Sequence, residues 1–200
     1  MTRFSAVLAA LVGLSLAAGA ASAQTADPTP LPLTDRTLRA ADGSSLSFGS
    51  AAGPEGLVVV FWSTACPWDD RYAPRLSDLV ASYGPAGVGF VLVTSEGPAA
   101  VPTAAPAPRR RPASAGLAAP YVDDVDGSLA AAFGARSTPH VFFYGPDRTL
   151  VYEGAIDDSP VDADRVRTPY LRQALDQSIA GLPVEVMRTQ AFGCTIKGRS

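Results

Sequence analysis

Residues that crosslink small domains or bind metals are scarce in this sequence. Of 200 residues, only Cys66 and Cys194 are cysteines, and His140 is the only histidine. Two cysteines are too few for a disulfide-dense scaffold, so the fold must depend on a hydrophobic core of ordinary size. One histidine and two distant cysteines give little support for a metal centre. We therefore expect His140 to be an ordinary strand residue, and we expect no metal and no cofactor.

Basic residues are not in excess. The chain has 16 Lys and Arg against 19 Asp and Glu, which gives a formal net charge of −3. A nucleic-acid partner normally requires a basic surface, so we expect none. The acidic residues Asp123-Asp124, Asp126 and Asp157-Asp158 lack the spacing of an EF-hand calcium loop. We expect them to act as turn residues and helix caps.

Long hydrophobic runs are confined to the N-terminus. Arg3 is followed by an apolar run over residues 4–18 and then by the small residues Ala21-Ser22-Ala23. This pattern predicts a signal peptide over residues 1–23, cleaved near Ala23. The run is shorter than the ~20 residues that span a bilayer, so we expect no stable membrane anchor. The mature protein would then be exported to the periplasm or the medium, where a disulfide can persist.

The remaining sequence alternates between strand-like and helix-like segments. We expect a flexible lead-in over 24–36 and one domain over 37–200, which ends in a tail over 182–200. Within that domain the patterns predict a hairpin over 38–48, a strand over 57–62, a helix over 68–83 kinked at Pro74, a strand over 87–95, an irregular tract over 97–120, a short helix over 127–133, a hairpin of strands over 140–144 and 149–156, and a helix over 168–180 with Thr168 as its N-cap. This order is typical of an α/β sandwich with parallel central strands and an antiparallel hairpin at one edge.

Cys66 occupies a position where a thiol becomes reactive. A continuous apolar run, typical of a buried strand, ends at Phe61-Trp62, and Cys66 follows four residues later at the start of the expected helix. The free N–H groups and the dipole of a helix N-terminus stabilise a thiolate and lower the pKa of a cysteine there. Such a thiolate can attack a disulfide or a peroxide. Both reactions need a second thiol, for which Cys194 is the only internal candidate.

Cys66, Pro74 and the run Ser137-Thr138-Pro139 resemble the active-site segments of thioredoxins. Cys66 corresponds to the first, nucleophilic cysteine of the Trp-Cys-x-x-Cys motif, Pro74 corresponds to the helix-kinking proline, and Asp69 replaces the second cysteine. The run 137–139 is similar to the cis-proline loop that faces the sulfur. The resemblance implies a thioredoxin-like three-layer α/β/α sandwich with a central mixed sheet, an N-terminal hairpin extension and a C-terminal tail.

Three further segments carry a closer similarity. Cys66-Pro67-Trp68, residues 154–158 (Gly-Ala-Ile-Asp-Asp) and residues 189–197 (Thr-Gln-Ala-Phe-Gly-Cys-Thr-Ile-Lys) resemble those of exported redoxins related to peroxiredoxins of the alkyl hydroperoxide reductase/thiol-specific antioxidant group. The resemblance covers residues 38–197. It implies redox chemistry at Cys66 on protein or small-molecule thiols, disulfides or hydroperoxides, with an external reductant that the sequence does not name. Trp68, Thr138 and Pro139 would line the substrate groove.

Three functions stay open at this point. A thiol-disulfide oxidoreductase would act through Cys66, with Cys194 or an external thiol as the resolving partner. A hydroperoxide reductase would use Ser63, three residues before the cysteine, and Arg136 to polarise the peroxide, although Val59 stands where peroxiredoxins carry a proline. A binding module without catalysis would hold a permanent Cys66–Cys194 disulfide.

Asp69 bears on the choice among these functions. It removes the local resolving cysteine, which favours the binding module. A charged carboxylate one turn into the helix would raise the pKa of the Cys66 thiol and make it less reactive. Alternatively, Asp69 and Asp70 only complement the helix dipole.

Overall fold

The structure, a computed structural model, describes residues 29–95 and 117–196. The predicted signal peptide and most of the predicted irregular tract, residues 97–116, lie outside the described residues. The central sheet has five strands in the order β5 (Tyr121–Asp123), β4 (Val88–Thr94), β3 (Gly56–Trp62), β7 (His140–Tyr144) and β8 (Leu150–Gly154). Strands β3, β4 and β5 are parallel, whereas β7 and β8 are antiparallel to their neighbours. The predicted mixed sheet with an antiparallel hairpin at one edge is confirmed.

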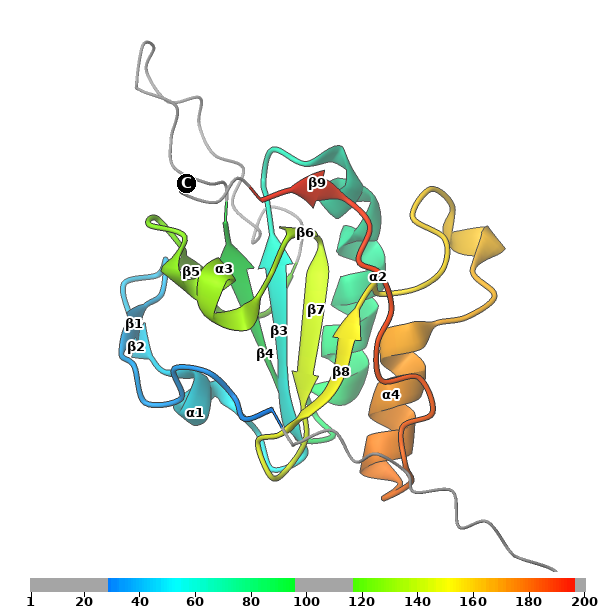
Figure 1. Ribbon diagram of the computed structural model, residues 1–200, viewed down its shortest axis with the longest axis horizontal. Coiled ribbons are helices and arrows are strands. Elements are labelled where there is room, and N and C mark those ends of the chain that lie inside the picture. Colours follow the sequence, from blue (N-terminus) through cyan, green and yellow to red (C-terminus); the bar gives the residue numbers. More distant parts are fainter. Residues whose placement is uncertain (1–28, 96–116, 197–200) are drawn as a thin grey trace, which may run out of the picture.

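Helices cover both faces of this sheet (Figure 1). The long helix α2 (Pro67–Tyr83) and the helix α4 (Tyr170–Ile179) lie on one face. The short helices α1 (Phe48–Ala51) and α3 (Ser128–Phe133) lie on the other. The result is the three-layer α/β/α sandwich that the resemblance implied.

The central strand β3 explains why two helical layers form. All its residues are buried, and successive side chains of a strand point to opposite faces. Val58 and Val60 therefore pack with the α2 and α4 side, while Val59 and Phe61 pack with the α1 and α3 side. A strand that is apolar at every position needs cover on both faces.

The N-terminal part of the domain forms the predicted hairpin, with β1 (Leu38–Arg39) antiparallel to β2 (Ser45–Leu46). The lead-in differs from the flexible segment that we predicted over 24–36. The Leu31 N–H donates to the Arg148 carbonyl at 2.9 Å, and the Leu31 side chain is buried in the core. The described part of the lead-in is therefore packed against the start of β8.

Three local features were not predicted. Helix α1 begins at a capping box in which the side chains of Ser47 and Ser50 bond each other's backbone N–H. Strand β5 follows the tract that we expected to be irregular. A short 3₁₀ helix, η2 (Ala163–Arg165), precedes α4. Helix α4 also starts later than predicted, because its N-cap is Pro169 instead of Thr168.

The C-terminal tail brings its end back to the sheet. After α4 the chain runs beside β8 (Figure 1), where Arg188 forms a parallel bridge with Glu153. It ends as β9 (Cys194–Thr195), which pairs antiparallel with β6 (Ser137–Thr138), just before β7. The tail thus reaches the end of β3 where α2 begins.

Candidate active site

Cys66 is the N-cap residue of α2. Strand β3 ends at Trp62, residues 63–65 form a loop, and Pro67 is the first residue of the helix. Proline suits that place because its missing N–H would have no partner there and its fixed φ matches a helix. Cys66 therefore lies against the free N–H groups of a helix of 17 residues, where a thiolate is stabilised.

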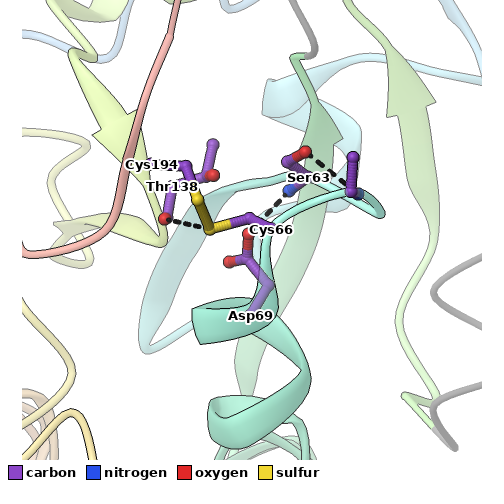
Figure 2. Close-up of a disulfide and its surroundings, with 6 residues drawn as sticks. Ser63, Cys66, Asp69, Thr138 and Cys194 are labelled. Carbon is purple, nitrogen blue, oxygen red and sulfur yellow. Dashed lines mark hydrogen bonds between the residues drawn. A yellow bond between two sulfur atoms is a disulfide. The ribbon is translucent and has the colours of Figure 1, made fainter.

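Cys194 reaches Cys66 although 128 residues separate them in the sequence. The pairing of β9 with β6 places Cys194 opposite Thr138. The two cysteines form a disulfide with their Cα atoms 5.9 Å apart (Figure 2). The structure thus brings together the two predicted cysteines. Cys66 itself is only 3% exposed, whereas Cys194 is half-buried.

The predicted cis-proline loop faces the disulfide. Thr138 and Pro139 are joined by a cis peptide bond, and both residues are buried. The Sγ atom of Cys66 lies 3.4 Å from the Thr138 carbonyl oxygen. That oxygen would accept the thiol proton of Cys66 once the disulfide is reduced. The part of Thr138 and Pro139 in binding a substrate stays a prediction.

Asp69 points from the first turn of α2 toward the disulfide, as Figure 2 shows. Its side chain is fully buried, and its Oδ2 atom accepts a hydrogen bond from the Ser63 backbone N–H at 3.0 Å. Its Oδ1 atom and the Oγ1 atom of Thr138 are buried without a hydrogen bond of regular geometry. Burial raises the pKa of Asp69 to about 8, against the opposing effects of the Ser63 N–H and the Thr138 hydroxyl.

This pKa changes the expected role of Asp69. Below pH 8 the side chain is mainly a neutral acid, so at neutral pH it does not repel a Cys66 thiolate as we expected of a carboxylate. It also adds little to the complement of the helix dipole, which is left to the exposed Asp70. At neutral pH Asp69 is therefore a buried, mainly neutral acid whose side chain faces the disulfide (Figure 2).

Ser63 has a local structural role. Its backbone N–H donates to Asp69, and its hydroxyl accepts a hydrogen bond from the Ala65 N–H at 3.2 Å. These two bonds fix the loop between β3 and Cys66. Any contact of the Ser63 hydroxyl with a peroxide stays a prediction.

Trp68 lies at the rim of the site. Its ring is half-buried and meets the ring of Phe192 edge-on, with the ring centroids 4.9 Å apart. The Arg71 guanidinium lies 5.6 Å from the centre of the same ring. Phe192, which sequence reasoning did not single out, therefore covers the residue that we expected to line the groove. Trp62, by contrast, is a core residue, as predicted.

Arg136 directly precedes β6. Its carbonyl accepts the Ile196 N–H at 2.9 Å, and its own N–H donates to Nδ1 of His140 at 3.4 Å. Its exposed side chain lines a groove of about 750 Å³ beneath the tail, which Phe192 also lines. Among the described contacts, none joins the Arg136 side chain to Cys66.

His140 is a packed strand residue, as predicted. It is buried in β7, and the centroid of its ring lies 4.4 Å from the centroid of the Phe142 ring. Burial and the nearby Arg136 guanidinium lower the pKa of His140 to about 4, so its imidazole is neutral at pH 7. The residues that the structure describes contain no group of three His, Cys, Asp or Glu side chains that could hold a metal ion.

A buried ion pair behind the site was not predicted as such. The Asp157 carboxylate accepts from Arg75 at 2.6 Å and from the Tyr72 hydroxyl at 3.3 Å. The Arg75 guanidinium also lies 4.0 Å from the centre of the Tyr72 ring. Asp157 is also the turn residue that we expected, because its carboxylate accepts the Ser159 backbone N–H at 2.9 Å. The only sequence signal for the ion pair was the 154–158 run. The pair ties the segment after β8 to α2.

Asp124 fulfils the expectation of an acidic helix cap. Its carboxylate accepts the backbone N–H groups of Leu129 and Ala130 at 2.9 Å each. Asp126 likewise accepts from the Ser128 N–H at 3.0 Å.

Within residues 29–95 and 117–196, no helix combines the length and the apolar character needed to cross a membrane.

The fold and site define a class of protein: a thioredoxin-like α/β/α sandwich with a cysteine pair between a helix N-terminus and a cis-proline loop. The chain belongs to the AhpC/TSA family, whose sequence profile matches residues 31–153. That span contains Cys66, Asp69 and Pro139, whereas Cys194 and its tail lie beyond it. No curated protein matches the chain.

Solved structures share this fold over most of the chain. A hypothetical protein of Sinorhizobium meliloti has a TM-score of 0.73 and 29% identity, over 86% of this chain and 95% of that one. An uncharacterised conserved protein of Geobacillus kaustophilus has a TM-score of 0.68 and 26% identity, over 86% and 89%. A thioredoxin-like protein in its oxidised form has a TM-score of 0.57 and 17% identity, over 76% and 97%. The last likeness concerns the fold alone.

Proposed function

We propose that this protein is an exported thiol-disulfide oxidoreductase that acts through Cys66, with Cys194 as its internal resolving partner. One observation carries the proposal: the N-cap thiol of α2 is bonded to a cysteine that a separate tail strand delivers. The disulfide between these cysteines can open and close without a change in the five-stranded sheet, because neither cysteine lies in one of its strands. We further propose that residues 1–23 are a signal peptide that is cleaved near Ala23.

The helix N-terminus indicates which sulfur forms the mixed disulfide with a substrate. It stabilises the Cys66 thiolate, so Cys66 is the nucleophile toward a substrate disulfide and, in the opposite direction, the sulfur that an incoming thiolate attacks. In that direction the new S–S bond joins the external sulfur to Cys66, the old bond breaks, and Cys194 leaves as a thiolate.

A second thiolate completes the exchange. It attacks the external sulfur of the mixed disulfide and expels the Cys66 thiolate, so that two external thiols become one disulfide and two electrons reach the cysteine pair. In the opposite direction the Cys66 thiolate attacks a substrate disulfide, and Cys194 then releases the product. Asp69 can give or take a proton beside Cys66 near pH 8.

Membership of the AhpC/TSA family favours hydroperoxide reduction as a second candidate. Here the Cys66 thiolate would attack a peroxide oxygen, the O–O bond would break and the alcohol would leave. The resulting sulfenic acid would condense with the Cys194 thiol, releasing water and forming the disulfide. The position of Arg136 weakens this candidate, because its described contacts do not reach Cys66.

The experiment that tests the proposal measures the thiol state of the mature protein. The protein is alkylated and weighed by mass spectrometry with and without mild reductant, and the reduced form is then titrated with oxidised glutathione and with hydrogen peroxide. Rapid re-formation of the Cys66–Cys194 bond by glutathione disulfide supports the oxidoreductase, and faster re-formation by peroxide supports the second candidate. A bond that mild reductants leave intact would mean a binding module with a permanent disulfide. The measured mass of the purified exported protein also tests whether the signal peptide is cleaved near Ala23.

A further inference from the structure

The tail is attached to the domain at two separate places, and only the inner place includes the disulfide. At the outer place, beside β8, the Glu153 N–H donates to the Met187 carbonyl at 3.0 Å and the Thr189 N–H donates to the Glu153 carbonyl at 2.9 Å. The Thr189 hydroxyl accepts the Ala155 N–H at 3.0 Å, and Arg188 pairs with Glu153 at 3.0 Å. None of these contacts depends on the disulfide.

The inner place, which we call the inner tail, comprises residues 192–196. It is held by the two residue pairs of β9 with β6, by the Ile196 N–H bond to Arg136, by Phe192 on Trp68, and by the disulfide. Residues 190–191 join the two places across the groove of about 750 Å³. When the disulfide opens, the outer contacts keep the tail attached. The inner tail then keeps its pairing with β6, the Ile196 N–H bond to Arg136, the packing of Ile196 on the core and the ring contact of Phe192.

Gly193 shows how closely the inner tail approaches the cis-proline loop. A Cβ atom at this position would overlap the Thr138 carbonyl oxygen and lie 2.6 Å from the Thr138 carbonyl carbon. Backbone atoms cannot move aside as the end of a flexible side chain can, so any larger residue would push the strand away from β6. The place directly before the cysteine therefore accepts glycine alone.

We propose that the inner tail occupies the position of a substrate, and that the surface it leaves on reduction binds an extended polypeptide with glycine directly before its reactive cysteine. The polypeptide would pair antiparallel with Ser137–Thr138, as β9 does, and would place an aromatic side chain on Trp68, as Phe192 does. Strand addition of this kind uses main-chain hydrogen bonds for affinity and side-chain pockets for specificity. This inference rests on the proposed function, because it names the substrate class of the same site.

The test uses the full-length mature protein with Cys194→Ser, which leaves Cys66 as the only thiol. The probe is a peptide with the sequence of residues 189–196, whose cysteine carries a thionitrobenzoate group. The Cys66 thiolate attacks the peptide sulfur, the mixed disulfide forms, and coloured thionitrobenzoate leaves, so that no further oxidant is needed. Matched probes replace the glycine or the phenylalanine by alanine, and free cysteine carrying the same group is the small-molecule control.

We expect the parent peptide to react fastest. The alanine in place of glycine should slow release by about 5-fold to 100-fold, since overpacking against a fixed backbone costs that much in affinity. The alanine in place of phenylalanine should slow it by about 2-fold to 10-fold, the worth of an aromatic pair. A second variant, Phe192→Ala in the Cys194→Ser protein, weakens the competing inner tail and should speed reaction with the parent peptide.

Two results would overturn the inference in distinguishable ways. If all four probes release thionitrobenzoate at the same rate, the site has no preference for a glycine-cysteine strand, while Cys66 is still a working nucleophile and the proposed function stands. If no probe reacts, although the protein is folded by circular dichroism, the proposed function fails together with the inference.

Discussion

The Asp69 carboxyl accepts a hydrogen bond from the Ser63 backbone N–H at 3.0 Å while its other oxygen is buried without one. Burial raises the pKa of this group from 3.8 to about 8 in the folded protein. The folded state therefore favours the protonated acid. Its contribution to stability is fully present below the unfolded pKa of 3.8 and is lost as the pH rises to about 8.

Asp69→Asn should remove this pH dependence. The neutral amide keeps the size and shape of the acid, so the variant and the parent should have similar melting temperatures near pH 4. The variant should become progressively more stable than the parent toward pH 8, because only the parent must bury an ionisable acid. Thermal unfolding at several pH values, with the disulfide intact, measures this.

Asp70→Asn is the matched control, because Asp70 is the exposed neighbour in the same helical turn. Its effect on the melting temperature should not change between pH 6 and pH 8. Parallel stability curves for the parent and Asp69→Asn across this range would show that Asp69 is ionised in the fold.

The ion pair of Arg75 with Asp157 should be essential to stability. The Asp157 side chain is only 4% exposed, so Arg75→Met leaves a buried carboxylate without its partner. We expect the free energy of unfolding to fall by about 3–5 kcal/mol, as for other buried pairs that lose one member. Urea denaturation measures the change. Arg165→Met, which removes the exposed partner of Asp162, should cost less than about 1 kcal/mol. Equal losses in the two variants would contradict this assignment.

Reduction of the disulfide should lower the stability of the parent protein. The bond closes a long loop, with a sequence separation of 128 residues, and its loss should cost about 2–5 kcal/mol. Cys194→Ser should show the same loss and no further response to reductant. Denaturation of both proteins with and without dithiothreitol checks this. A parent protein whose midpoint ignores reductant would contradict the expectation.

Phe192→Ala should make the disulfide easier to reduce. The ring contact with Trp68 stabilises the closed tail, and an aromatic pair contributes about 0.5–1.5 kcal/mol. Its loss should raise the reduction potential by about 10–30 mV. Met187→Ala, at an exposed position of the same tail, is the control and should leave the potential unchanged. A shift of the same size in both variants would mean that the Trp68 contact does not hold the tail.

Much of the fold could be predicted because its main segments have strong local patterns. The apolar run ending at Trp62 and the periodic helix after Cys66 need only side-chain spacing, and both are confirmed. Helix α1 has four residues and β5 has three, too few for any period to appear. Their place depends on packing against β4 instead.

The site was harder to predict because its details depend on the tail. An acid in the first turn of a helix is usually exposed, and sequence spacing alone could not show that Asp69 faces the disulfide. The pairing of Phe192 with Trp68 joins segments more than a hundred residues apart, for which a single sequence holds no signal. The cysteine pair was found because Cys194 was the only other thiol.

The most direct test of the redox function is the reduction potential of the Cys66–Cys194 bond. The mature protein is equilibrated in glutathione buffers of known potential, and the fraction of alkylated cysteine is read by mass spectrometry. A catalytic pair should give a value between about −120 and −270 mV, as in known dithiol oxidoreductases. A value below about −300 mV, typical of structural disulfides in secreted proteins, would contradict a redox role for Cys66.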